Sequence, residues 1–225
     1  MRFLDPHIHV TSRTTDDLQF GVLGEFNPVL PASYRRTPYV FLACAQPELQ
    51  LRVMDQTQGK ALFVSDTIEF YIQNSRRALS KVFARSDGLI LNDSEVKLIT
   101  GESNLVRAGK ALLRFGPRFA VVKKGEHGGL LVTREGVFPF PAYPLESVLD
   151  PTGAGDSFAG GFMGAVARGR ATGLPALRKA VVAGTVMASF ACEGISLSRL
   201  VRLSDKDVRE RARRMPHASD PHTRG

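Results

Sequence analysis

The stretch Asp150-Pro151-Thr152-Gly153-Ala154-Gly155-Asp156 decides the fold, and an apolar run over 158–166 follows it directly. That run combines small and apolar residues and predicts a helix, so the two glycines stand at a helix N-terminus. Glycine has no Cβ, which allows consecutive backbone N–H groups to approach a ligand closely. Free N–H groups and the helix dipole both favour negative charge at this end of a helix. The stretch therefore predicts an anion site next to the carboxylate of Asp156.

A carboxylate beside an anion site makes chemical sense in phosphoryl transfer. The transferred group needs hydrogen-bond donors around its oxygens, while the acceptor hydroxyl needs a base in line with it. Asp156 would be that general base, a role that typically contributes roughly 100- to 10,000-fold in rate. A glycine turn capped by Asp156 is the plain structural alternative, and Gly-x-Gly-Asp alone fits both interpretations.

The full heptapeptide is more specific than its glycines. It resembles the second signature of the PfkB, or ribokinase-like, family of carbohydrate and nucleoside kinases, and the resemblance extends over about 28–203. It implies an ATP-dependent kinase with a sugar or nucleoside substrate, in which Asp156 deprotonates the substrate hydroxyl. It also implies that the backbone amides of Gly153, Ala154 and Gly155 hold the transferring phosphoryl group.

Short apolar runs alternate with helical patterns through the middle of the chain. The runs predict strands at 39–43, 61–65, 88–91 and 119–123, and the helical patterns fall at 47–54, 75–85, 95–100 and 104–115. An edge strand is predicted at 137–142 and a second apolar helix at 174–190. Strands alternating with helices predict an α/β fold with a largely parallel sheet and helices on both faces, which is also the fold that the ribokinase-like resemblance implies.

Polar residues follow the predicted strands, and ligands of such sheets bind at the carboxyl ends of the strands. Asp66 ends one strand, and Asn92 with Glu95 follows the next. An Asn three residues before a Glu fits a capping box that starts a helix. The same pair resembles the Asn-x-x-Glu motif of the family, which implies that Glu95 orders Mg²⁺ through water and that Asn92 lies near the phosphates of ATP. Both interpretations can hold together.

A glycine-rich segment follows the strand that ends at Lys123. Gly125 and Gly128 permit close backbone approach to a nucleotide, but Gly128 could equally belong to a hairpin turn before the apolar run at 130–133. The matching loop of the family contacts ATP, so the resemblance implies that Lys123, Gly125 and Gly128 bind the nucleotide. Some relatives have Thr or Ser where this chain has Lys123 and Lys124.

Two further sites are implied by the resemblance. Gly194, just after the second apolar helix, would line the adenine pocket, although packing alone explains the segment 191–195 equally well. In members of the family that use a monovalent cation, Asp150 and Thr152 would help to hold K⁺.

The N-terminal segment 1–34 shows no clear period and is predicted to be irregular. His7 and His9 are separated by one residue in an extended stretch, so both imidazoles would face the same side, as ligands of a zinc site do. Residues 1–17 resemble the start of TatD-like metal-dependent hydrolases. A catalytic zinc needs at least a third ligand, and no later segment supplies the rest of that pattern.

Charge and composition bound the function classes. The chain carries a formal net charge of +8, but much of the excess is arginine scattered over predicted helix faces, with a cluster in 202–214. This distribution favours a solvated surface over a nucleic-acid site. The apolar runs are shorter than a membrane span and the first residues lack a signal-peptide core, so we expect no membrane and a cytoplasmic protein. Cys44 and Cys192 are predicted to be buried free thiols.

The acceptor half of the expected site is not recognisable. The family carries a Gly-Gly-x-x-x-Asn segment and a small β lid in its first strands, and neither can be identified before Asn27. We therefore expect an N-terminally incomplete ribokinase-like domain at 35–203, followed by a charged helix and a disordered tail at 204–225. Three hypotheses remain: a kinase, either alone or completed by a homodimer or a partner chain; a shortened kinase-like protein that binds nucleotide with little or no activity; and a metal-dependent hydrolase that uses His7 and His9.

Overall fold

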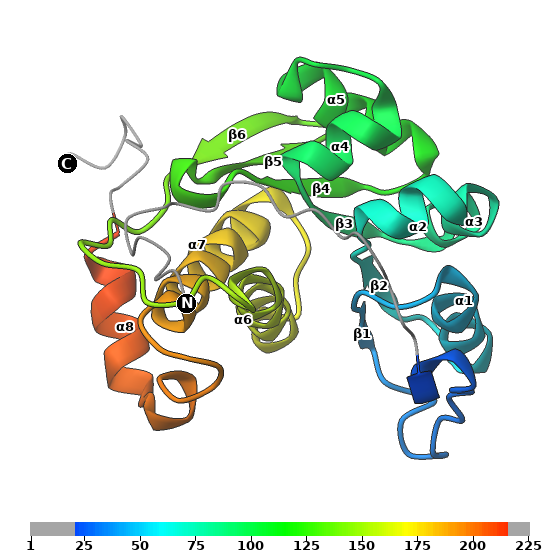
Figure 1. Ribbon diagram of the computed structural model, residues 1–225, viewed down its shortest axis with the longest axis horizontal. Coiled ribbons are helices and arrows are strands. Elements are labelled where there is room, and N and C mark those ends of the chain that lie inside the picture. Colours follow the sequence, from blue (N-terminus) through cyan, green and yellow to red (C-terminus); the bar gives the residue numbers. More distant parts are fainter. Residues whose placement is uncertain (1–20, 216–225) are drawn as a thin grey trace, which may run out of the picture.

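The computed structural model describes residues 21–215, which form one six-stranded sheet covered by helices (Figure 1). The strands lie side by side in chain order, so every connection joins neighbouring strands. The first four strands run parallel to one another, and the fifth runs antiparallel to both of its neighbours, the fourth and the sixth. Their bounds are β1 Tyr39–Leu42, β2 Leu62–Ser65, β3 Gly88–Asn92, β4 Phe119–Lys123, β5 Gly129–Thr133 and β6 Gly136–Phe140. The predicted α/β fold and its largely parallel sheet are confirmed.

The helices that connect the parallel strands cover one face of the sheet (Figure 1). Buried Leu89 and Leu91 of β3 pack against them, whereas Ile90 packs on the opposite face. Successive side chains of a strand point to opposite faces, so both faces need a helical layer. The connecting helices are α1 Pro47–Gln56, α2 Glu69–Asn74, α3 Arg76–Arg85, α4 Asp93–Thr100 and α5 Leu105–Leu112.

The opposite face is covered by α6, Ala154–Gly169, and α7, Leu174–Cys192. Phe162 of α6 is fully buried, with its ring centroid 5.8 Å from that of Phe119 in β4. Glycines let the two helices approach closely: a Cβ on Gly161 would lie 2.8 Å from the Ala183 carbonyl oxygen. The heptapeptide at the start of α6 is thereby fixed to the middle of the sheet.

The charged helix α8, Asp205–Arg213, packs on the end of α7. Arg211 was expected to be solvated with its neighbours, but its side chain lies over the ring of Phe190 at 3.5 Å and its guanidinium pairs with Glu193 at 2.7 Å. Apolar contacts of Val186, Phe190 and Met215 complete this junction. The described residues also contain four 3-10 helices: η1 Gly21–Gly24, η2 Leu113–Phe115, η3 Gly125–His127 and η4 Leu200–Arg202.

Several expectations are modified. The short helix α2 was not predicted, and α6 begins at Ala154, two residues before Asp156. The prediction that Cys44 is buried was wrong: the residue is exposed in the turn that follows β1, beyond the covered part of the sheet, while Cys192 is half-buried. Both thiols are free, as predicted.

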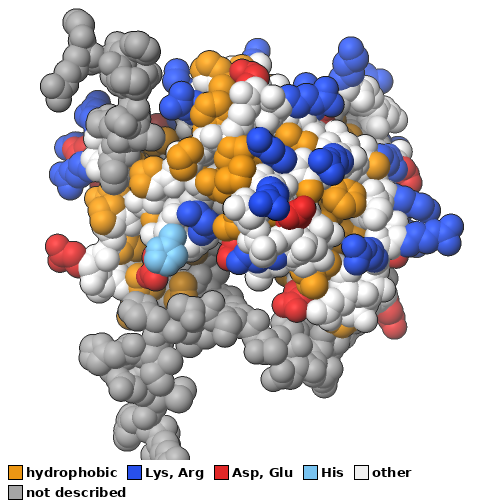
Figure 2. Space-filling view, turned by 90° about the horizontal axis from the view of Figure 1, so that it is seen from above, with side chains coloured by type: hydrophobic (Ala, Val, Ile, Leu, Met, Phe, Trp, Pro, Cys, Tyr) orange, Lys and Arg blue, Asp and Glu red, His pale blue; other side chains and the backbone are white. Residues whose placement is uncertain are grey.

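One described helix, α7, has the length and apolar character needed to cross a membrane. Half of that stretch is buried inside the fold, against α6 and the sheet, which is the behaviour of a core helix. Figure 2 shows Lys and Arg side chains on the displayed face interspersed with acidic and apolar ones. That mixture fits the solvated surface predicted from the sequence.

The packing of α6 predicts a contrast between two substitutions on that helix. Phe162→Ala removes a fully buried ring and should lower the free energy of unfolding by about 3–5 kcal/mol. Gly160→Ala adds a methyl group where no atom lies within 4 Å and should raise it by roughly 0.5–1 kcal/mol. Urea unfolding followed by circular dichroism measures both, and equal effects would contradict this packing of α6.

Candidate active site

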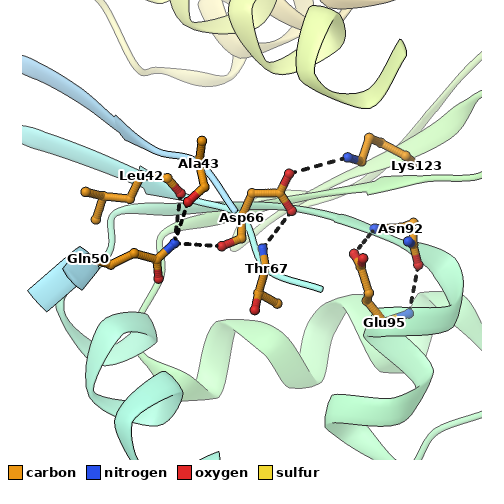
Figure 3. Close-up of polar contacts among 8 residues, drawn as sticks. All are labelled: Leu42, Ala43, Gln50, Asp66, Thr67, Asn92, Glu95 and Lys123. Atoms are coloured by element: carbon orange, nitrogen blue, oxygen red, sulfur yellow. Dashed lines mark hydrogen bonds and ion pairs between the residues drawn. The ribbon is translucent and has the colours of Figure 1, made fainter. Parts of the chain in front are cut away.

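Polar side chains from three adjacent parallel strands meet at the carboxyl edge of the sheet (Figure 3). Asp66 follows β2, Asn92 ends β3 and Lys123 ends β4. Because the carboxyl ends of parallel strands lie at one edge, residues far apart in the sequence become neighbours there. The first turn of α6 lies at the same edge, since Gly155 is close to the Lys123 side chain.

Asp66 and Lys123 form a shielded ion pair. The Asp66 side chain is 9% exposed, and its Oδ2 lies 3.8 Å from Lys123 Nζ, while Oδ1 accepts a 2.7 Å hydrogen bond from Thr67 N. Burial raises the pKa of the Asp66 carboxyl; the Lys123 charge and the Thr67 N–H oppose that rise, and the charge of Asp156 adds to it. The last effect places Asp156 within electrostatic reach of the pair.

Gln50 of α1 holds the strand ends in place. Its Nε2 donates to the carbonyl oxygens of Leu42, Ala43 and Asp66 at 3.1, 2.9 and 3.0 Å. The side chain is buried and links the end of β1 to the end of β2 (Figure 3). This residue could not be predicted from the sequence, because a single glutamine in a helical pattern carries no signal of its contacts.

The capping box at the start of α4 is present. Asn92 Oδ1 accepts from Glu95 N at 2.8 Å, and Glu95 Oε2 accepts from Asn92 N at 2.8 Å. The Glu95 side chain is buried, and that burial, the largest cause, raises its pKa to about 7, with the Asp66 charge adding to the rise. The structural interpretation of this motif is confirmed, and it leaves a buried carboxyl close to Asp66.

In the glycine turn, Gly153–Gly155, one of the two glycines adopts a backbone conformation that favours glycine. Gly153 is left-handed, with φ 78°, and ends the turn before α6. The Ala154 N–H donates to the Pro151 carbonyl at 3.1 Å, so that amide already has a partner. Within residues 21–215, the N–H groups of Gly155 and Asp156 have no hydrogen-bond acceptor. A Cβ at Gly155 would lie 3.2 Å from Lys123 Nζ, so the ammonium group stands directly beside the turn.

Asp156 projects into solvent from the first turn of α6. The residue is exposed, and the described part of the chain offers it no ion pair or side-chain hydrogen bond. The thiol of Cys44 is partly shielded although the residue is exposed, and this shielding, with the charges of Asp66, Glu95 and Asp156, raises the thiol pKa to about 11. The three carboxyl groups therefore lie within electrostatic reach of one thiol at the sheet edge.

The loop after β4 is a hairpin connection. Strands β4 and β5 pair antiparallel, and Lys124 N donates to the Gly128 carbonyl at 2.8 Å across the turn. Gly128 has φ 73°, and a Cβ there would lie only 2.1 Å from the Phe140 carbonyl oxygen. Gly128 is thus required by the hairpin. Gly125 has φ 56° and open space around it, as a ligand-facing position would.

The residues predicted to hold a monovalent cation lie just before the glycine turn. Thr152 N donates to Asp150 Oδ1 at 2.8 Å, and Leu149 N donates to the Cys192 carbonyl at 2.8 Å. The second bond brings the end of α7 next to Asp150. Gly194 follows there, buried, with its N–H bonded to the Ala191 carbonyl at 3.3 Å.

Metal ligation by side chains alone is not supported in the described residues, where no three His, Cys, Asp or Glu groups are placed to share an ion. Mg²⁺ in nucleotide sites keeps several waters and uses one or two carboxylates with the substrate phosphates. The buried carboxyls of Asp66 and Glu95 fit that mode. His7 and His9 of the predicted zinc site lie outside the described residues.

The chain is similar to a family of known proteins. The profile of the family described as pfkB family carbohydrate kinase matches residues 47–199. The chain belongs to this family. It is 31% identical over 160 residues to a cytidine kinase of Thermococcus kodakarensis, an alignment that covers 68% of this chain and 56% of that protein. The family membership confirms the predicted resemblance and the ribokinase-like fold.

Solved structures of the family share the fold. The nucleoside kinase of Methanocaldococcus jannaschii superposes with a TM-score of 0.69 at 24% identity, over 86% of this chain and 60% of that one. Aminoimidazole riboside kinase from Salmonella enterica, solved with aminoimidazole riboside and an ATP analogue, gives 0.64 at 20% identity, over 79% of this chain and 63% of that one. The chain thus spans about half of the curated relative named above and somewhat more of the solved ones.

Glu95 predicts a pH dependence of stability. Its pKa is about 7 in the folded protein against an ordinary 4.5, so between these values the folded state keeps a proton that the unfolded state loses. Stability should fall as pH rises from about 4.5 to 7, by roughly 3 kcal/mol from this group. Glu95→Gln retains the capping acceptor and should flatten the fall.

Urea unfolding of both proteins at pH 5, 6, 7 and 8 measures the effect. Glu48→Gln, at an exposed carboxyl in the first turn of α1, is the matched control and should keep the wild-type slope. Parallel curves for wild type and Glu95→Gln would show that the carboxyl is not held protonated.

Proposed function

We propose that the chain is the nucleotide-binding and catalytic part of an ATP-dependent kinase that phosphorylates a hydroxyl group of a sugar or nucleoside. The observation that carries this proposal is the first turn of α6. There Asp156, an exposed carboxylate with no side-chain partner among residues 21–215, stands beside two backbone N–H groups that have no acceptor in the same part of the chain. A structural cap would use its carboxylate on those N–H groups, whereas a general base must be free to meet a substrate.

Asp156 is proposed to act on the acceptor. Its carboxylate takes the proton of the acceptor hydroxyl as that oxygen attacks the γ-phosphorus of ATP. The bond between the γ-phosphorus and the bridging oxygen breaks, and ADP leaves with the electron pair. Its exposure at the start of α6 leaves the carboxylate open to the acceptor hydroxyl.

The transferring phosphoryl group is proposed to bind at the glycine turn. The N–H groups of Gly155 and Asp156 supply donors, and the Lys123 ammonium beside Gly155 supplies a positive charge. Fixed donors of this kind stabilise charge that develops on phosphoryl oxygens. Gly153 belongs to the same turn, while the Ala154 N–H would have to exchange its bond with Pro151 to take part.

Magnesium is proposed to be held from the other side of the site. Asp66 and Glu95 would bind it directly or through water, with Asn92 close to the phosphates of ATP. When bound, Mg²⁺ neutralises charge on the phosphate oxygens. Gly125 and Gly194 would approach the nucleotide, and Asp150 with Thr152 would serve a monovalent cation such as K⁺; these assignments rest on the family resemblance.

A second candidate is a protein that binds ATP with little turnover. It is favoured by the outer edge of β1, which pairs with no strand in the described residues. A homodimer or a partner chain on that edge would then complete the acceptor site.

Substitution of Asp156 separates the two candidates. Asp156→Asn should reduce turnover of ATP with a panel of sugars and nucleosides by roughly 100- to 10,000-fold, because the base is lost, while ATP binding stays within about threefold of wild type. ADP release measures turnover, and the ATP-induced rise in Tm measures binding.

Asp205→Asn is the matched control, because it removes an exposed carboxylate from the first turn of α8. It should leave turnover unchanged. Turnover that survives in Asp156→Asn would exclude this residue as the base, and ATP binding without turnover in the wild type would favour the second candidate.

A further inference from the structure

A cavity of about 500 Å³ lies at the amino ends of the parallel strands, away from the glycine turn. Lys60 precedes β2, Asp87 precedes β3 and Arg118 precedes β4, so three connections contribute side chains to it. The loop between α6 and α7 supplies Arg170. Because α6 has 16 residues and separates this loop from the glycine turn, the two regions lie about 24 Å apart.

Positive charge is in excess in this cavity. Three cationic side chains line it with a single carboxylate, Asp87, whose two oxygens are both in use. Asp87 Oδ1 lies 3.0 Å from Arg118 Nη2, and Oδ2 accepts from Phe63 N at 3.0 Å. Within the described residues, Lys60 and Arg170 have no ion-pair partner. Two cations are therefore available to a ligand, beside an Arg118 that is paired with Asp87.

Arg170 adopts a backbone conformation that arginine seldom takes. It follows α6 with φ 48° and ψ 32°, the left-handed region that favours glycine. A non-glycine residue held there costs of order 1 kcal/mol or more, and such residues gather at functional positions. The left-handed conformation has one plain explanation, that residue 170 ends α6 as a left-handed cap, where an arginine also complements the negative end of the helix dipole. That explanation does not account for the cavity in front of it.

The remaining wall suits an organic group. Tyr39, the first residue of β1, presents an aromatic side chain to the cavity, and Thr172 adds a hydroxyl. The volume falls within the range of small-molecule sites, roughly 300–1,000 Å³. By contrast, Arg85 and Lys97 each stand next to an acidic partner, Asp55 and Asp93.

We propose that this cavity binds a phosphate-bearing small molecule at a site separate from the glycine turn. Lys60 and Arg170 contact the phosphate, Arg118 is held in place by Asp87 as a third donor, and Tyr39 packs on whatever the phosphate is attached to. Arginine and lysine from different segments give such an anion several charge-assisted hydrogen bonds. The site requires no kinase activity of the chain.

The test uses two probes, inorganic pyrophosphate and cytidine monophosphate, titrated calorimetrically into the full chain. Lys60→Gln and Arg170→Gly should each weaken binding of the bound probe about tenfold, since each removes a charged donor. Arg170→Gly relieves the left-handed strain, so its Tm should equal or exceed that of the wild type, which separates lost binding from lost folding. Tighter binding of cytidine monophosphate than of pyrophosphate would assign the site to an organic phosphate, and the reverse order to an inorganic one.

Arg77→Gln is the control for overall charge, because Arg77 is exposed at the start of α3 and lines no part of the cavity. It should leave the affinities unchanged. The proposal is overturned if neither probe binds, if Arg77→Gln weakens binding as much as the two cavity variants, or if both cavity variants bind as the wild type does. In the last case the probes bind at the glycine turn, and Arg170 acts only as the residue that ends α6.

Discussion

The ammonium group of Lys123 lies between the end of the sheet and α6, the helix that begins within the heptapeptide. It pairs with the buried carboxylate of Asp66 and stands beside Gly155, where a Cβ would lie 3.2 Å from it. Removal of the ammonium would leave a shielded carboxylate without its partner, which is costly in a low-dielectric setting. The elements around the ion pair hold its two residues in place. Strands β2 and β4, which carry Asp66 and Lys123 at their ends, flank β3, and α6 contacts β4 through the rings of Phe162 and Phe119.

Acidic groups outnumber basic ones at this edge. Asp66, Glu95 and Asp156 influence one another and the nearby thiol of Cys44, and two of the three have a raised pKa because burial disfavours their charged forms. An anionic nucleotide would meet repulsion from these groups on its own. A divalent cation bound with the nucleotide would reverse that balance and lower both raised pKa values again. In the proposed kinase, proton release from Glu95 and binding of the metal would therefore be coupled.

Most of the fold could be predicted from the sequence, because its elements depend on local patterns. The runs that became β3 and β4 are apolar on both faces, as buried parallel strands must be, and the capping box at Asn92 and Glu95 is itself a local signal. The helix α2 was missed because its six residues are too short to show a period. Gln50 was missed because its three contacts join strands that are distant in the sequence.

The sequence indicated which residues form the candidate site better than it indicated how they are arranged. The heptapeptide indicated the anion site, but only the structure shows that the Ala154 amide is already bonded and that Lys123 lies against Gly155. Sequence spacing left Gly128 open between nucleotide contact and hairpin turn, and the nearness of the Phe140 carbonyl decides for a structural need. The expected burial of Cys44 failed because an apolar neighbourhood in sequence does not show where a strand leaves the covered sheet.

A crystal structure of the chain with Mg²⁺ and a non-hydrolysable ATP analogue tests most directly whether phosphate binds at the start of α6. If it does, a terminal phosphate oxygen lies about 3 Å from the backbone nitrogen of Gly155, within reach of Lys123 Nζ, and the Asp156 carboxylate faces the γ-phosphorus. A nucleotide bound elsewhere, with the Gly155 and Asp156 amides meeting only water, would contradict it.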